Sequence, residues 1–215
     1  MTSSFAFLRP LVTICFLSIF GVAQAQSLED MFKAVKSNDA STVERLLQRG
    51  IDANSTDTRG DTLLMQASRE GHEEIVVRLI AARARINARN ASDESALMLA
   101  ALKGYLPIVT RLQAAGAEMN HSGWNPLLYA AFEGKTPVCK FLLEKGADID
   151  ALAPNDATAL MLASRQGHLE TVKLLLWEHA NPHIKTADGL TALKWAAKAG
   201  NSDIVALLKQ AGAKE

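Results

Sequence analysis

Histidine and cysteine are the residues of this sequence best suited to metal binding or catalysis, and they are few. His179 and His183 stand four residues apart, a spacing that places two metal ligands on one face of a helix. Asn181 and Pro182 lie between them, and proline interrupts a helix. We therefore predict no metal site here and no cofactor elsewhere.

Cys139 is a candidate nucleophile, but its position argues for a buried and inert thiol rather than a redox role. Valine fills the corresponding place in other segments of the chain, at Val76, Val109, Val172 and Val205. No serine or cysteine is accompanied by a histidine and an acid at positions independent of a repeating pattern. The glycines follow that pattern too, and do not form a phosphate-binding loop. The sequence therefore predicts a protein that is not an enzyme.

The N-terminal segment has the features of an export signal. Residues 1–9 carry one charge, Arg9, and residues 11–22 form an apolar run of about 12 residues, too short to span a bilayer. Ala23-Gln24-Ala25 then matches a signal-peptidase site. We predict a signal peptide over 1–25, cleaved after Ala25, and a periplasmic or secreted mature chain. The alternative is an uncleaved membrane anchor.

The composition excludes some partners. Lys and Arg number 23, as do Asp and Glu, so the basic excess of a nucleic-acid-binding protein is missing. Aromatic residues make up only 6%, which together with abundant Ala and Leu favours short, closely packed helices over a sheet. We expect no nucleic acid, no membrane contact after signal cleavage, and a monomer.

The strongest pattern is an internal repeat of 33 residues. The segment 158–168 recurs at 191–201, and its counterparts start at Thr62, Ser95 and Asn125. A weaker first copy places Ala34 in step with Ala67. The one irregular step runs from Ser95 to Asn125 and is 30 residues long, because three residues are missing from the loop after Gly116.

A second apolar pattern follows each copy and indicates a second helix. Ile75, Val76 and Leu79 are spaced to form one helical face, and Gly116, Gly146 and Gly212 close later copies. Two other copies place Arg83 and His179 at the glycine position. We expect a steric cost of about 1 kcal/mol at each.

Thr-x-Leu-x-x-Ala-x-x-x-Gly-His, followed by Ile-Val-x-x-Leu-Leu and Gly-Ala-Asp, resembles the ankyrin repeat from Ser27 to the C-terminus. The resemblance implies an all-α ankyrin-repeat solenoid of about six helix–turn–helix repeats with projecting hairpin loops, in a domain over 26–215. The expected repeats cover about 27–54, 55–87, 88–120, 121–150, 151–183 and 184–215. The family's loop histidine is missing, and its place is taken by Met65, Met98, Leu128, Met161 and Lys194.

Each repeat needs its neighbours to bury its apolar face. The end repeats should therefore be polar on the outside, and they carry Lys36, Ser37, Asn38, Lys194 and Lys209. Five alanines should line up at matching buried contacts, namely Ala67, Ala100, Ala130, Ala163 and Ala196.

Partners of ankyrin repeats lie along a concave groove, and the residue two before the repeat glycine tends to face it. By this resemblance we predict partner-binding residues on the successive first helices and on one hairpin: Arg69, Leu102, Lys103, Trp124, Phe132, Glu133, Arg165 and Lys198. Basic side chains would then flank an apolar centre. Phe132 is the principal surface residue. Tyr129 and Trp124 are alternatively packing residues between repeats, and Trp195 is assigned to the core.

The resemblance implies a non-catalytic protein–protein interaction module. The signal segment predicts that it is exported to a bacterial periplasm or out of the cell, and the groove residues predict a partner that presents an apolar knob with acidic neighbours. Two alternatives stay open. One is an inhibitor or immunity protein that occludes an exported toxin or enzyme. The other is an envelope stress-protection factor that supports another enzyme.

Overall fold

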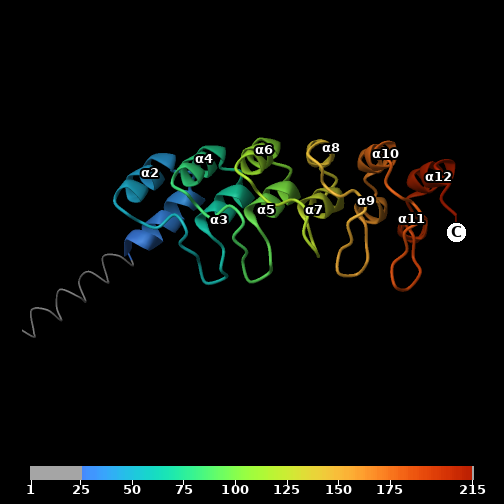
Figure 1. The fold of residues 1–215 in the computed structure, drawn as a ribbon, viewed down its shortest axis with the longest axis horizontal. Coiled ribbons are helices and arrows are strands. Elements are labelled where there is room, and N and C mark those ends of the chain that lie inside the picture. The colour runs from blue at the N-terminus through green and yellow to red at the C-terminus, as the bar shows by residue number, and fades with distance from the viewer. Residues whose placement is uncertain (1–25, 215) are drawn as a thin grey trace, which may run out of the picture.

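The computed structural model describes residues 26–214, which form two layers of helices stacked along one axis (Figure 1). The inner helices are α3 (Leu63–Glu70), α5 (Ala96–Lys103), α7 (Pro126–Phe132), α9 (Ala159–Gln166) and α11 (Ala192–Ala199). The outer helices are α2 (Ala40–Gln48), α4 (Glu73–Ala81), α6 (Leu106–Ala114), α8 (Thr136–Glu144), α10 (Leu169–Trp177) and α12 (Ser202–Gln210). A helix over 26–36 pairs with α2. The predicted solenoid of six repeats is confirmed, with hairpin loops projecting beside the inner layer.

The repeated polar residue at the start of each segment is a helix cap. The Thr62 hydroxyl accepts a hydrogen bond from the Met65 amide at 3.1 Å, and Ser95, Asn125, Thr158 and Thr191 accept equivalent bonds. These residue types stabilise helix starts because they satisfy an amide that has no helical partner. The repeat glycine ends the helix in a left-handed conformation, as at Gly71, where φ is 82°.

In two repeats, a methionine sulfur accepts a hydrogen bond at the position of the missing family histidine. The Thr62 amide donates to the sulfur of Met65 at 3.4 Å, and the Ser95 amide donates to that of Met98 at 3.3 Å. Sulfur is a weak acceptor, but it gives these amides a partner in a buried place. The hairpins before α3 and α5 are thus still tied to their helices.

The stack is held together by one apolar interior. The five alanines singled out by the repeat, from Ala67 to Ala196, are all 0% exposed. Their small side chains let each inner helix approach its neighbour closely, while residues such as Val76 and Leu79 bring the outer layer onto the same core. The predicted column of buried alanines is confirmed.

The hairpin before α7 is three residues shorter than the others, as predicted. Figure 1 shows it projecting less far than its neighbours. Arg83 and His179 adopt the left-handed conformation expected at the glycine position, with φ values of 61° and 68°.

The connections between repeats carry a ladder of hydrogen bonds that the sequence analysis missed. Asn54 Oδ1 accepts from the Arg85 amide at 2.7 Å, and Asn87 Oδ1 accepts from the Glu118 amide at 2.9 Å. The next two bonds of this kind are made by Asn120 and Asp150. Asparagine recurs here with the 33-residue period, so the signal was present in the sequence. The ladder fixes the spacing of successive repeats.

Candidate protein-binding surface

Three aromatic side chains meet on the inner layer beside the short hairpin. The centroid of the Trp124 ring lies 4.9 Å from that of the Tyr129 ring. It lies 6.0 Å from that of the Phe132 ring, which it meets edge to face. Tyr129 and Phe132 share one face of α7 because they are three residues apart. We call these residues the aromatic cluster. All three are half-buried, and Trp124 and Phe132 also pack against the core, so these residues pack between repeats while part of each ring stays exposed.

Tyr129 also joins a polar contact with the preceding repeat. Its hydroxyl donates to Glu94 Oε1 at 3.3 Å. Burial raises the pKa of Tyr129 to about 12, and the charge of Glu94 and this hydrogen bond act in the same direction. Tyr129 is therefore a neutral donor whose orientation is fixed by Glu94.

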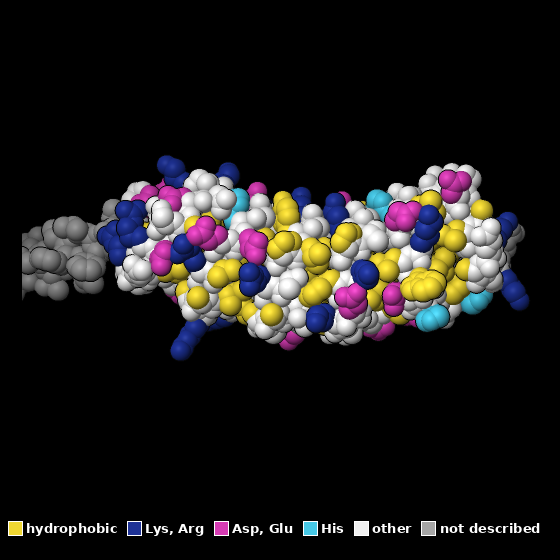
Figure 2. Space-filling model, turned by 90° about the horizontal axis from the view of Figure 1, so that it is seen from above, with side chains coloured by type: hydrophobic (Ala, Val, Ile, Leu, Met, Phe, Trp, Pro, Cys, Tyr) yellow, Lys and Arg dark blue, Asp and Glu magenta, His cyan; other side chains and the backbone are white. Residues whose placement is uncertain are grey.

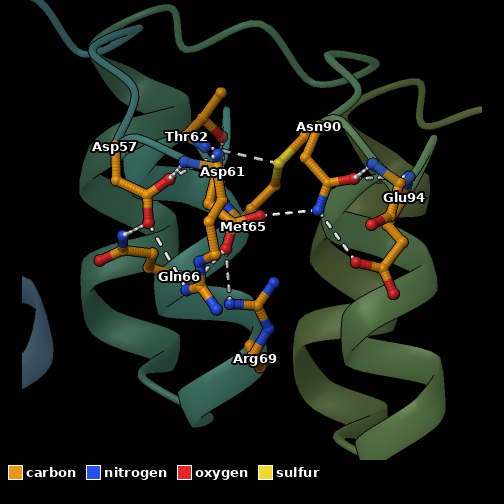
Figure 3. A network of polar contacts seen from close by, with 10 residues as sticks. Asp57, Asp61, Thr62, Met65, Gln66, Arg69, Asn90 and Glu94 are labelled. Carbon is orange, nitrogen blue, oxygen red and sulfur yellow. Dashed lines mark hydrogen bonds and ion pairs between the residues drawn. The ribbon is translucent and has the colours of Figure 1, made fainter.

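A buried carboxylate, Asp61, organises the N-terminal half of this surface (Figure 3). Asp61 is 1% exposed and accepts hydrogen bonds from Arg69 Nη1 and Asn90 Nδ2, both at 2.7 Å. Arg59 Nη2 lies 3.0 Å from Asp61 Oδ2. Burial by itself would raise the pKa of Asp61, but the hydrogen bonds from Arg69 and Asn90 and the two arginine charges outweigh it and lower the pKa.

This polar network continues into the fourth repeat. Asn90 Nδ2 also donates to Glu94 Oε2 at 2.9 Å, and Glu94 in turn accepts from Tyr129. The sequence analysis placed Arg69 on the inner layer but missed its partner Asp61. Arg69 is consequently an ion-paired side chain that holds Asp61, and Asp61 joins the two hairpins through Asn90.

The C-terminal half of the inner layer is different. The Arg165 guanidinium lies over the Trp195 ring, 5.4 Å from its centroid. Arg165 and Lys198 line an open hollow of about 370 Å³ together with Leu190, Trp195 and Ala199. Trp195 is 9% exposed, which confirms its assignment to the core.

The other predicted residues occupy the middle of the inner layer. Leu102 is half-buried on α5, Lys103 is the exposed last residue of that helix, and the exposed Glu133 follows α7. Of the predicted set, the structure thus places Trp124 and Phe132 in the aromatic cluster, Arg165 and Lys198 at the C-terminal hollow, and Arg69 in the polar network, while Leu102, Lys103 and Glu133 join none of these.

The outer layer carries an apolar surface that the sequence analysis did not single out. In the N-terminal half Arg78 pairs with Glu44 and Glu74, and Arg111 pairs with Glu73. The same repeat position in α8, α10 and α12 is filled by apolar residues, Phe141, Leu174 and Leu207. Figure 2, which views the molecule from the outer-helix side, shows apolar side chains from its middle to its C-terminal end. Trp177, the last residue of α10, is 80% exposed.

The candidate chemical groups do not form a reactive site. Cys139 is 0% exposed, and burial raises its pKa to about 12, so its thiol is protonated and inert, as predicted. His179 and His183 both lie in the loop after α10 and not on a helix face. Across residues 26–214, no three His, Cys, Asp or Glu side chains are grouped to hold a metal. No helix within that range is long and apolar enough to cross a membrane, and the predicted signal segment lies outside the described residues.

Comparisons with known proteins agree with the geometry. The human ASB11 ankyrin repeat domain superposes with a TM-score of 0.80 at 23% identity, covering 86% of this chain and 84% of that one. An ankyrin repeat-containing protein of Treponema pallidum is 29% identical over 73% of this chain and 43% of its own length. Ankyrin repeat protein nuc-2 of Neurospora crassa is 49% identical over 53 residues, which are 25% of this chain and 5% of that protein.

The chain spans less than half the length of these curated relatives, so they show kinship of the repeats alone. The model of the family described as "Ankyrin repeats (3 copies)" matches residues 31–122, 79–153, 97–187 and 127–215. Because these overlapping matches extend from residue 31 to the C-terminal residue, this chain belongs to the ankyrin repeat family.

Proposed function

We propose that this protein is a non-catalytic interaction module that binds a partner protein through its inner helices and hairpins. The observation that carries the proposal is the aromatic cluster, three large, half-buried rings beside a shortened hairpin. Large aromatic side chains in partly enclosed places supply most of the binding free energy in many interfaces. The ankyrin fold supports this proposal, because ankyrin repeats imply a protein-interaction module.

The frame around the cluster supports binding without rearrangement. Glu94 fixes Tyr129, and Asp61 fixes both Arg69 and the next hairpin through Asn90. A surface that is already ordered loses little conformational entropy when a partner binds. We therefore expect the aromatic cluster to act as a rigid anchor.

The test is a variant that gives repeat four the residues of repeat five. Trp124→Ala and Phe132→Arg introduce the side chains found at the corresponding positions, Ala157 and Arg165, so the helices should still pack. The partner for this test is a protein captured from an envelope fraction with the unaltered chain. Because each aromatic anchor contributes about 2 kcal/mol, we expect the affinity for that partner to fall by at least about 100-fold. Titration calorimetry measures this change, and circular dichroism checks that the helical content is kept.

Trp177→Ala is the matched control, because it removes an equally large ring from the outer layer. This control should bind as the unaltered protein does. If Trp177→Ala abolished binding while the repeat-four variant bound normally, the partner would lie on the outer layer and the proposed surface would be wrong.

We further propose that the protein is exported to the periplasm. The support is the apolar run over 11–22 and the small residues Ala23 and Ala25 of the sequence. Mass spectrometry of the protein from its native cell should show Gln26 as the first residue, in the periplasmic or secreted fraction. A membrane-bound chain that still carries residues 1–25 would instead indicate an anchor.

A further inference from the structure

Within the part of the chain that the structure describes, two cationic side chains of the inner layer have no acidic partner, and the repeat shows the reason. Arg165 occupies the position that Arg69 holds in repeat two, where Asp61 accepts its hydrogen bond at 2.7 Å. In repeats five and six the position of Asp61 is filled by Ala157 and Leu190. Within residues 26–214, neither Arg165 nor Lys198 makes an ion pair.

The two cations flank a hollow with an apolar floor. Its volume is about 370 Å³, within the size range of sites that hold one small group, and Leu190, Trp195 and Ala199 complete its lining. No carboxylate is among the lining residues. Trp195 lies 5.4 Å from the Arg165 guanidinium, and such stacking limits the orientations of that group while leaving its N–H donors available.

We propose that this hollow binds an acidic side chain of the partner protein together with an adjacent apolar side chain. The carboxylate is held by Arg165 and Lys198, through charge-assisted hydrogen bonds, and the apolar group lies against Leu190 and Trp195. This inference rests on the proposed function and specifies the chemistry that the C-terminal end of the same surface recognises.

Charge and size favour an acidic protein segment over a nucleic acid. Two cations in a single small hollow match one carboxylate, whereas a phosphate backbone requires basic residues spread along its length. The formal net charge of the chain is zero, so no general basic field accompanies the hollow. The apolar floor adds a preference for a neighbouring hydrocarbon side chain.

The test uses a capped peptide, acetyl-Gly-Glu-Leu-Glu-Gly-amide, added to the ¹⁵N-labelled chain and followed by nuclear magnetic resonance. The matched control is the same peptide with both Glu replaced by Gln. We expect saturable shifts of the Trp195 indole N–H and the Lys198 amide with the acidic peptide, and at least tenfold weaker binding of the control. Arg165→Gln with Lys198→Gln should abolish the shifts with only a small fall in the melting temperature, because both side chains are exposed and only the contact of Arg165 with Trp195 is lost.

Three results would overturn the inference. These are an unmoved Trp195 signal at millimolar acidic peptide, equal shifts with the Gln peptide, and equal shifts with inorganic phosphate at the same concentration. The repeat-four variant separates this inference from the proposed function. If the acidic peptide does not bind but the repeat-four variant still loses the captured partner, the role assigned to the hollow is wrong and the proposed function stands. If the variant keeps its partner, the proposed surface is wrong.

Discussion

At the scale of single residues, the role of a side chain depends more on the residue that it contacts than on its position in the repeat. Arg69 and Arg165 occupy the same position, yet Arg69 is paired with a buried carboxylate and Arg165 lies over an aromatic ring. The difference comes from Asp61 and Ala157, eight residues before each arginine. An identical backbone therefore produces a rigid brace in one repeat and an available cation in another.

Replacing Asp61 by Asn should destabilise the protein by about 2 kcal/mol at pH 7, because hydrogen bonds to a buried charge are lost and Arg69 loses its counter-ion. The folded-state pKa of Asp61 lies below the unfolded value of about 3.9. This stabilisation is therefore fully present above that value and is lost as the pH falls through the folded pKa. Urea unfolding at pH 7 and at pH 3 measures the difference.

The same comparison can also contradict this explanation. If the variant and the unaltered protein differ equally at both pH values, the carboxylate charge is not what stabilises the network. Asp93→Asn is a suitable control, because the Asp93 side chain is exposed and its ion pair with Arg89, at 3.5 Å, lies outside the network.

At the scale of helices and hairpins, most boundaries follow from the sequence. Thr62 and Gly71 mark the start and end of α3 because one caps the first turn and the other adopts a left-handed φ. The missing loop residues were also located correctly. The contacts between one hairpin and the next were not predicted, because the bond from Asn90 to Asp61 joins residues 29 positions apart and depends on how the hairpins fold back.

The repeat glycine does more than end a helix, and Gly134→Ala tests this. Gly134 has a φ of 65°, and an added Cβ would lie 2.6 Å from the His168 ring of the next repeat. We expect a loss of about 2–3 kcal/mol, from left-handed strain together with a displaced ring. Urea unfolding followed by circular dichroism measures it.

Gly146→Ala provides the reference, because Gly146 has a φ of 88° and open space around it. Only the backbone strain applies there, and we expect a loss of about 1 kcal/mol. Equal losses in the two variants would show that the contact between Gly134 and His168 contributes nothing to the coupling of repeats.

At the scale of the whole molecule, the fold could be predicted because its information is periodic. The 33-residue spacing identifies the helix pairs, and the alanines from Ala67 to Ala196 form the shared interior that the spacing implies. The surface could be predicted only in part. The inner position was recognised, but which of its side chains are neutralised, stacked or free depends on contacts between repeats, as Arg69 and Trp124 show.

The surface of the outer layer, too, could be predicted only in part from the sequence. Trp177 stands where Ala81 and Ala114 occur in earlier repeats, so the period gave no reason to expect an exposed ring there. Residues 26–214 consequently expose apolar side chains on both layers, and the central claim is that the inner layer receives the partner.

Hydrogen–deuterium exchange on the complex with the captured partner tests that claim most directly. The account predicts slower exchange in the hairpins and inner helices of repeats three to six, strongest around Trp124 and the N-terminal turn of α7, where hairpin amides become covered. Outer helices α8 and α10 should exchange as they do in the free protein. Slower exchange confined to α8, α10 and the segment around Trp177 would contradict the account.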